Sequence, residues 1–166
     1  VLVTYGGGSV KKTGVLDQVL SALAGFDVLE FGGIEPNPSY ETLMNAVKIA
    51  REENVTFLLA VGGGSVLDGT KFIAAAAHYD ANIDPWEILE TYGSKITRAI
   101  PMGSVLTLPA TGSESNKGAV ISRKTTGDKR AFMSEHVQPV FAILDPVYTY
   151  TLPPRQVANG VVDAFV

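Results

Sequence analysis

The chain has 166 residues, of which 46% are hydrophobic and 18% charged, so it can bury one substantial core and has an ordinary globular composition. Its 13 basic and 17 acidic side chains leave a formal net charge of −4, which offers no broad positive surface for nucleic acid. The absence of cysteine excludes disulfides and thiolate sites, and no apolar run approaches the roughly 20 residues that a membrane span needs. We therefore expect a cytoplasmic protein without nucleic acid or membrane partners.

Short apolar runs alternate with amphipathic stretches along most of the chain. The runs with the length and branched character of buried strands, each ended by Gly or Pro, are residues 1–5, 26–31, 57–61 and 104–108. Between them, apolar residues recur at spacings of three and four within residues 15–23 and 43–50, which predicts helices. Strand, helix and strand in this order imply right-handed crossovers. The pattern therefore predicts an α/β fold with a Rossmann-like, doubly wound parallel sheet.

The pattern changes after Pro109. Residues 119–132, AVISRKTTGDKRAF, predict an inserted antiparallel hairpin with a Gly-containing turn and a basic tip. Residues 139–146, PVFAILDP, predict a further strand, and a helix follows for which Thr151 is the expected cap. Because the chain begins within an expected strand and ends within a helical pattern, we expect a fragment of a longer protein.

Two glycine-rich junctions each follow an apolar run. The first is GGGS at residues 6–9, and the second is VGGGSVLDGTK at residues 61–71. At the carboxyl end of a parallel strand, glycine lets the backbone approach an anionic oxygen, and the next helix presents unpaired N–H groups to a phosphate. Neither junction matches the P-loop or the G-x-G-x-x-G pattern. A tight corner without any ligand is the alternative explanation of such a turn.

A third segment, LTLPATGSESNKGAVI at residues 106–121, resembles the signature of the iron-containing (group III) alcohol dehydrogenases, which have a dehydroquinate-synthase-like fold. The resemblance extends over the whole chain and is nearest to the NADP-dependent butanol dehydrogenase and broad-specificity aldehyde reductase branch. It rests on GGGS, EPNPSYETL, AVGGGSVLDGTKFIA, TLPATGSESN, DKR, LDP and DAFV. It implies that residues 1–166 are the N-terminal dinucleotide-binding domain, without the C-terminal helical metal-binding domain.

The resemblance also implies roles for single residues in cofactor binding. Gly63, Gly64 and Ser65 would hold the pyrophosphate, and Asp68 would contact the nicotinamide end. A carboxylate favoured by the helix dipole is the alternative reading of Asp68. Thr107 and Thr111 match hydroxyl groups on the adenine and phosphate side, and Lys129 matches a lysine that reaches the ribose.

The first junction bears on the choice between NAD and NADP. Relatives that prefer NAD tend to carry an Asp after the first strand, whose carboxylate binds the ribose 2′-hydroxyl and repels a 2′-phosphate. This sequence has no carboxylate there, but has Gly6, Gly7, Gly8 and Ser9, followed by Lys11 and Lys12. NADP is therefore the expected cofactor.

The family resemblance further implies a divalent metal ion, iron first, with zinc or manganese as alternatives. Asp163 matches the aspartate ligand, whereas His78 and His136 match none of the histidine ligands and are expected to pack or to lie at the surface. The implied activity of the complete protein is NADP(H)-dependent, metal-assisted interconversion of primary alcohols and aldehydes, with a homodimer as the assembly and no turnover by the fragment alone. A glycerol dehydrogenase or dehydroquinate synthase relative, and a non-catalytic nucleotide-binding module, are the alternatives.

Overall fold

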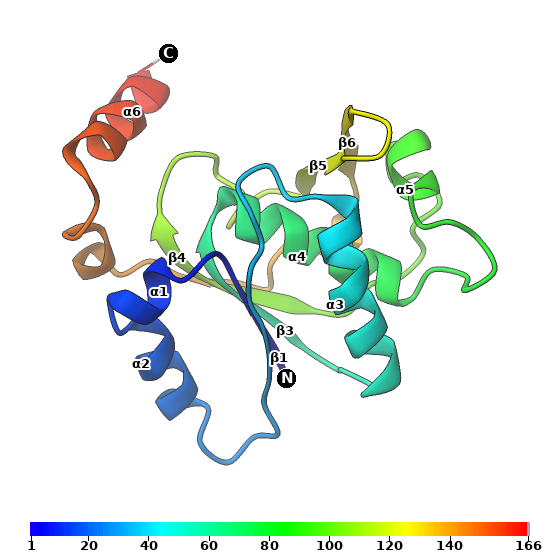
Figure 1. The fold of residues 1–166 in the computed structure, drawn as a ribbon, viewed down its shortest axis with the longest axis horizontal. Helices are drawn as coiled ribbons and strands as arrows, with labels where there is room; N and C mark the ends of the chain where they lie inside the picture. Colours follow the sequence, from blue (N-terminus) through cyan, green and yellow to red (C-terminus); the bar gives the residue numbers. More distant parts are fainter. Residues whose placement is uncertain (166) are drawn as a thin grey trace.

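The structure of the chain is a computed structural model that describes residues 1–165, apart from the side chains of Asp163 and Ala164. Its centre is a five-stranded, fully parallel sheet in the order β2-β1-β3-β4-β7 (Figure 1). The strands are β1 (Leu2–Tyr5), β2 (Leu29–Phe31), β3 (Leu58–Gly63), β4 (Met102–Leu108) and β7 (Phe141–Ile143). The antiparallel hairpin consists of β5 (Gly118–Arg123) and β6 (Asp128–Met133). The predicted α/β fold with an inserted hairpin is confirmed.

Helices cover both faces of the sheet. One face packs against α3 (Tyr40–Glu52) and α4 (Gly64–Ala77), with the short helix α5 (Glu87–Glu90) and the hairpin beyond them. The other face packs against α1 (Ser9–Lys12) and α2 (Val15–Ala22). Successive strand residues point to opposite faces, so Leu2 lies in the first core and Val3 in the second. This is the doubly wound arrangement, in which buried strands read as continuous apolar runs.

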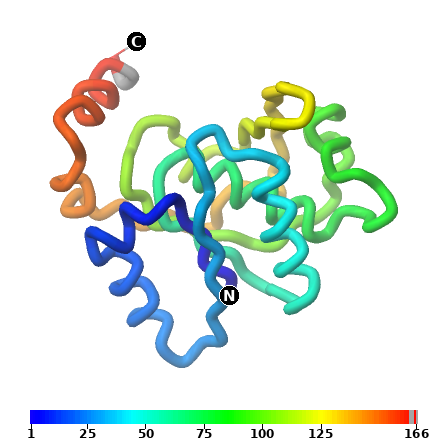
Figure 2. The backbone as a smooth tube through the Cα atoms, in the orientation of Figure 1, coloured from blue at the N-terminus to red at the C-terminus, as the bar shows by residue number. Residues whose placement is uncertain are grey.

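The strand order places a topological switch point between β1 and β3. From β1 the chain turns outward through α1 and α2 to β2, and it then returns through α3 to β3 on the other side of β1 (Figures 1 and 2). Ligands of open α/β sheets bind at such a point, beyond the carboxyl ends of the strands. Both glycine junctions lie there, because Gly6 follows β1 and Gly64 follows β3.

The last part of the chain contains η1 (Glu135–Val137), η2 (Pro146–Thr149) and α6 (Pro154–Phe165). Figures 1 and 2 show α6 standing apart from the sheet, at the end where α1 also lies. The expectation that Thr151 caps this helix is wrong, because the helix begins at Pro154. The carbonyl of Pro153 accepts hydrogen bonds from the N–H groups of Gln156 and Val157. Among the described residues, no helix combines the length and apolar character that a membrane crossing requires.

Candidate functional site

The two glycine junctions leave the sheet side by side. Tyr5 of β1 and Val61 of β3 are register partners, so the residues after them start from adjacent strands. The helix α4 begins at Gly64 with no side-chain cap and no acidic residue in its first turn. Its first N–H groups lack intrahelical partners and carry the positive end of the helix dipole. Ser65 lies in this first turn, as predicted, and the arrangement can receive a phosphate.

A hollow of about 390 Å³ adjoins the first junction and is lined by Tyr5, Gly6, Gly7, Gly8, Lys11, Gly32 and Gly33. The Lys11 ammonium lies 4.9 Å from the centroid of the Tyr5 ring. Interaction with the Tyr5 phenol raises the pKa of Lys11, so this side chain stays cationic at neutral pH. Lys11 therefore supplies a positive charge at the edge of the hollow, whereas Lys12 is exposed and does not line it.

The glycines of the two junctions are required for different reasons. A Cβ at Gly64 would lie 2.5 Å from Thr111 Oγ1, and one at Gly62 would lie 2.7 Å from Val66 Cγ2, so close packing within the chain demands glycine at both positions. A Cβ at Gly7 would meet no atom within 4 Å. Packing thus explains the second junction without any ligand, but it leaves Gly7 unexplained.

The threonines predicted from the TGSES segment lie beside the second junction. Thr107 is half-buried near the end of β4, which pairs with β3 through Gly63 and Leu108. Thr111 follows β4, and its side chain packs against the first residue of α4. Its Oγ1 also accepts a 3.3 Å hydrogen bond from the N–H of Ser113. The structure therefore places the predicted site residue Thr111 beside Gly64, the residue before Ser65.

Asp68 has partners that the sequence did not reveal. Its Oδ1 accepts a 2.7 Å hydrogen bond from the Ser113 hydroxyl, and its Oδ2 accepts a 3.0 Å bond from the N–H of Val120. The alternative of a first-turn carboxylate does not hold, because the first turn of α4 contains no acidic residue. Asp68 thus connects α4 to the loop before the hairpin and to β5. A carboxylate has about four lone-pair sites, so its oxygens keep capacity for a further donor.

Lys129 reaches the segment that crosses the sheet after β2. Its ammonium donates a 2.8 Å hydrogen bond to Asn37 Oδ1, and Asn37 has the left-handed φ of 55°. The segment lies against the first junction, since the Ile34 carbonyl oxygen would be 3.3 Å from a Cβ at Gly6. The structure therefore connects Lys129 to that junction through residues 34–37. Asn37 was missed in the sequence, although it lies in the quoted EPNPSYETL motif.

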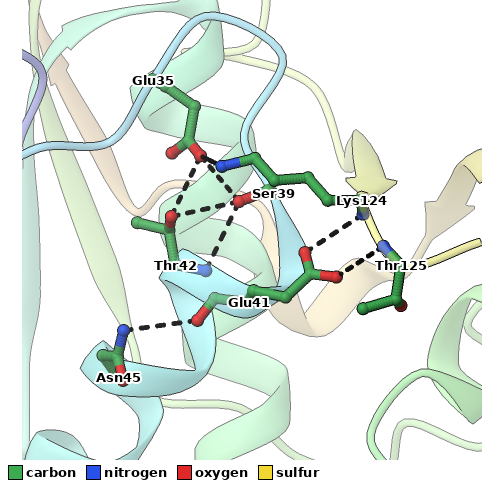
Figure 3. A network of polar contacts seen from close by, with 7 residues as sticks. All are labelled: Glu35, Ser39, Glu41, Thr42, Asn45, Lys124 and Thr125. Atoms are coloured by element: carbon green, nitrogen blue, oxygen red, sulfur yellow. Dashed lines mark hydrogen bonds and ion pairs between the residues drawn. The ribbon is translucent and has the colours of Figure 1, made fainter. Parts of the chain in front are cut away.

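A polar network holds the hairpin turn against the start of α3 (Figure 3). Glu35 Oε1 accepts bonds from the Lys124 ammonium at 2.7 Å, the Ser39 hydroxyl at 2.6 Å and the Thr42 hydroxyl at 3.0 Å. Burial alone would raise the pKa of Glu35, but these donors lower it to about 2. The carboxylate of Glu41 accepts the backbone N–H groups of residues 124 and 125. The hairpin that carries Lys129 is thus fixed to the segment that carries Asn37.

Arg123 provides a second anchor for the hairpin. Its guanidinium lies 4.9 Å from the ring centroid of Tyr40 and 5.2 Å from that of Trp86. It also forms a 2.9 Å ion pair with Asp84. Burial alone would raise the pKa of Asp84, but hydrogen bonds from the Tyr40 hydroxyl, the Trp86 N–H and Arg123 lower it. Cation–π contacts of this kind contribute about 0.5–1 kcal/mol at exposed sites and more when desolvated.

Asp163 is the one metal ligand that the sequence predicts in this chain. Asp163 lies on α6, but its side chain is outside the described part of the structure. Within residues whose side chains are described, no group of three or more His, Cys, Asp and Glu residues could hold a metal ion. His78 and His136 are exposed, in agreement with their predicted place at the surface. The described residues therefore do not form a metal centre by themselves.

A larger hollow of about 540 Å³ lies at the opposite edge of the sheet, between the end of α3 and the starts of β3 and β4. Its cation, Arg51, already donates to the backbone carbonyls of Ala76, Ala77 and Tyr79. These bonds complete the C-terminal end of α4. Helix N-termini of an open α/β sheet point to the other edge, so the switch point is the better ligand site.

Comparison with known proteins agrees with this geometry. The family model described as iron-containing alcohol dehydrogenase matches residues 1–146. The chain is 85% identical over 166 residues to the NADPH-dependent aldehyde reductase YqhD of Escherichia coli (strain K12), covering 100% of this chain and 43% of that protein. It is 50% identical over 165 residues to the probable NADH-dependent butanol dehydrogenase 1 of Bacillus subtilis (strain 168), covering 98% and 42%.

A solved structure resembles the chain equally well. The crystal structure of YqhD from E. coli K-12 has a TM-score of 0.97 and 85% sequence identity, covering 99% of this chain and 42% of that one. The chain thus spans about two fifths of the length of these relatives. The relatives carry different cofactors in their names, NADPH and NADH, so overall identity does not decide between the two nucleotides.

Proposed function

Because the chain belongs to the iron-containing alcohol dehydrogenase family, we propose that it is the cofactor-binding half of an NADP(H)-dependent enzyme that interconverts primary alcohols and aldehydes. The observation that carries the proposal is that two sites able to bind an anion lie side by side at one switch point. One is the uncapped start of α4, and the other is the hollow beside Gly7. Two such sites suit a ligand with phosphate groups at two places.

The residues present fit NADP. The N–H groups at the start of α4, with Ser65, face the pyrophosphate, and the residues at 6–9 face the adenosine ribose. The 2′-phosphate then meets the cationic Lys11, which lines the hollow, and Ser9 next to it. None of the lining residues carries a carboxylate, and the Glu30 carboxylate accepts a 3.1 Å hydrogen bond from the Tyr5 hydroxyl. Charge-assisted hydrogen bonds are roughly twice as strong as neutral ones, which favours NADP over NAD.

The remaining residues orient the cofactor. Thr107 and Thr111 lie on its adenine and phosphate side, Lys129 with Asn37 lies toward the ribose, and Asp68 lies toward the nicotinamide end. Bound NADP(H) supplies hydride transfer at its nicotinamide ring. The residues of this chain bind and orient the dinucleotide, and we propose that the substrate pocket is completed by parts of the protein beyond this chain.

We further propose that the complete protein holds a divalent metal ion, iron first, with zinc or manganese as alternatives. Asp163 is its proposed ligand from this chain, on the ground of family membership. A single carboxylate does not complete a metal site, so the other ligands come from the rest of the protein. The complete protein is proposed to be a homodimer located in the cytoplasm.

The cofactor assignment is tested by titrating NADPH and NADH into the complete protein and its Lys11→Met variant. We expect NADPH to bind more tightly to the unmodified protein. Loss of a charged hydrogen bond of about 1.5 kcal/mol should weaken NADPH binding about tenfold in the variant, with NADH binding nearly unchanged. Lys48→Met, a change at an exposed lysine of α3 that pairs with Glu52, is the control and should alter neither.

Tighter binding of NADH than of NADPH would refute the assignment, as would an equal loss of both nucleotides in Lys11→Met. Activity is measured separately, as NADPH oxidation with a short-chain aldehyde. The complete protein should reduce the aldehyde, and the 166-residue chain should not. Nucleotide binding without turnover by the complete protein would instead identify a non-catalytic binding module.

A further inference from the structure

Lys71 is a buried cation inside the candidate site. It lies on α4, one turn after Asp68, and its side chain is fully buried. Lysine is almost never fully buried unless its ammonium is paired, because an unpaired buried charge is costly. A lysine in this place therefore needs a specific set of partners.

The Lys71 ammonium has three hydrogen-bond acceptors, two in the loop before the hairpin and one in the first residue of β5. They are Ser113 Oγ at 2.9 Å, Asn116 Oδ1 at 2.8 Å and the Gly118 carbonyl at 2.8 Å. An ammonium carries three donors, so every one of them is used. Lys71 thus attaches residues 113–118 to α4 through its charge.

The Ser113 hydroxyl passes this constraint on to Asp68. Since its oxygen accepts from the Lys71 ammonium, its proton is free to donate to Asp68 Oδ1 at 2.7 Å. The other oxygen of Asp68 is held by the N–H of Val120. The Ser113 hydroxyl therefore connects the Lys71 ammonium to the Asp68 carboxylate.

We propose that Lys71 is a positioning residue of the cofactor site, whose ammonium holds residues 113–118 on α4 and, through Ser113, orients Asp68 for the nicotinamide end of the dinucleotide. The inference rests on the proposed function, because Asp68 and Thr111 are the groups that this loop presents to the cofactor. It predicts that removal of the Lys71 charge weakens nucleotide binding, although Lys71 itself does not contact the cofactor.

The ammonium of Lys71 loses its proton at a lower pH than that of an ordinary lysine. Burial lowers the pKa of its ammonium to about 8, while the carboxylates of Asp68 and Glu114 oppose the shift. A neutral amine has only two donors for the three acceptors. Either one acceptor is left unpaired, or the Ser113 hydroxyl turns toward the amine and releases Asp68. Cofactor affinity should therefore fall as the pH rises through about 8.

Charged side chains on the other elements packed against α4 are engaged elsewhere or exposed. On α3, Arg51 donates hydrogen bonds to carbonyls near the C-terminal end of α4, and Glu41 accepts hydrogen bonds from the backbone of the hairpin. Lys48, also on α3, forms an ion pair with Glu52. On β5, Arg123 pairs with Asp84. On η1, Glu135 pairs with Lys117 and His136 is exposed. Asp68 and Glu114 are thus the charges that act on Lys71.

The test measures NADPH affinity of the complete protein from about pH 7 to about pH 9.5. This range lies above the second pKa of roughly 6 of a phosphate monoester, so the cofactor keeps its charge throughout. Lys71→Met should bind NADPH about tenfold more weakly than the unmodified protein at pH 7, because buried acceptors lose a charged partner. Its affinity should then stay flat, whereas that of the unmodified protein falls above about pH 8.

Two further variants keep the test decisive. Ser113→Ala removes only the connection to Asp68 and should weaken NADPH binding about fivefold, a loss within the range for one hydrogen bond. Lys48→Met, at the exposed side chain on α3, should follow the profile of the unmodified protein. If Lys71→Met does not fold, the profile of the unmodified protein and the affinity of Ser113→Ala provide the answer.

A Lys71→Met variant that melts at a lower temperature but keeps the affinity and pH profile of the unmodified protein would overturn the inference, because Lys71 would then act on stability alone. A flat profile for the unmodified protein, together with unchanged affinity of Ser113→Ala, would overturn it as well. Failure of the unmodified protein to bind NADPH at any pH would overturn the proposed function itself.

Discussion

The Gly7→Ala variant should raise the stability of the fold while it weakens the binding of NADPH. A Cβ at Gly7 meets no atom within 4 Å, and its backbone does not have a positive φ, so alanine fits the chain without strain. Replacing glycine at a compatible position reduces the freedom of the unfolded chain and stabilises a protein by about 0.4–1 kcal/mol. For a domain of this size, that corresponds to a rise in melting temperature of about 2–4 °C at most.

Gly7 lines the hollow that the cofactor is proposed to occupy, and a methyl group there meets no protein atom within 4 Å. Inserting a methyl group into an occupied, well-packed space costs about 1–3 kcal/mol. NADPH binding to the complete protein should therefore weaken about tenfold or more in Gly7→Ala. The assay combines thermal unfolding without nucleotide and fluorescence titration with NADPH, on the same preparation of each protein.

In Gly7→Ala, the melting temperature should rise and the affinity for NADPH should fall. Unchanged NADPH affinity in a folded Gly7→Ala variant would refute the placement of the cofactor over the first junction. A lower melting temperature without nucleotide would show that Gly7 is required by the fold, and the tight-corner explanation would then account for it.

Two further predictions follow from the packing and the charges of the site. Gly64→Ala places a Cβ 2.5 Å from Thr111 Oγ1, so it should destabilise the protein by about 1–3 kcal/mol in chemical denaturation and also weaken NADPH binding, unlike Gly7→Ala; equal stability of the two alanine variants would contradict this. The pKa of Glu35 is lowered from 4.5 to about 2, so its contribution is complete above pH 4.5 and is lost as the pH falls toward 2. Glu35→Gln should remove about 1 kcal/mol of this acid-sensitive stability, since the pair with Lys124 is partly exposed, and its free energy of unfolding should vary less than that of the unmodified protein between these pH values.

Local patterns were sufficient for most of the elements. The predicted strand at 57–61 corresponds to β3, which extends two residues further into the glycines, and the predicted strand at 26–31 shortens to Leu29–Phe31. The shortening has a physical cause, because β2 is an edge strand with one neighbour and is largely exposed. The hairpin and the helix after the second junction appear where the pattern predicts them.

The partners of the site residues could not be predicted in this way. Lys71 belongs to the quoted VGGGSVLDGTK segment, yet the sequence does not show that its ammonium meets a loop more than 40 residues later. The pairing of Lys129 with Asn37 spans 92 residues, and that of Lys124 with Glu35 spans 89. Hydrogen bonds of this kind depend on distances and directions that no spacing in the chain records.

The sequence by itself determined the alternation of strands and helices, the places where the backbone must come close to its surroundings, and the family. It could do so because periodicity and glycine requirements are properties of neighbouring residues. Only the tertiary structure decided that Gly62 and Gly64 are demanded by packing whereas Gly7 borders an open hollow. Only the tertiary structure also showed that the Ser113 hydroxyl bonds both to Asp68 and to the buried Lys71. The physical reason is that burial removes water from these groups, so each must find its partner in whatever segment the fold brings within hydrogen-bonding distance.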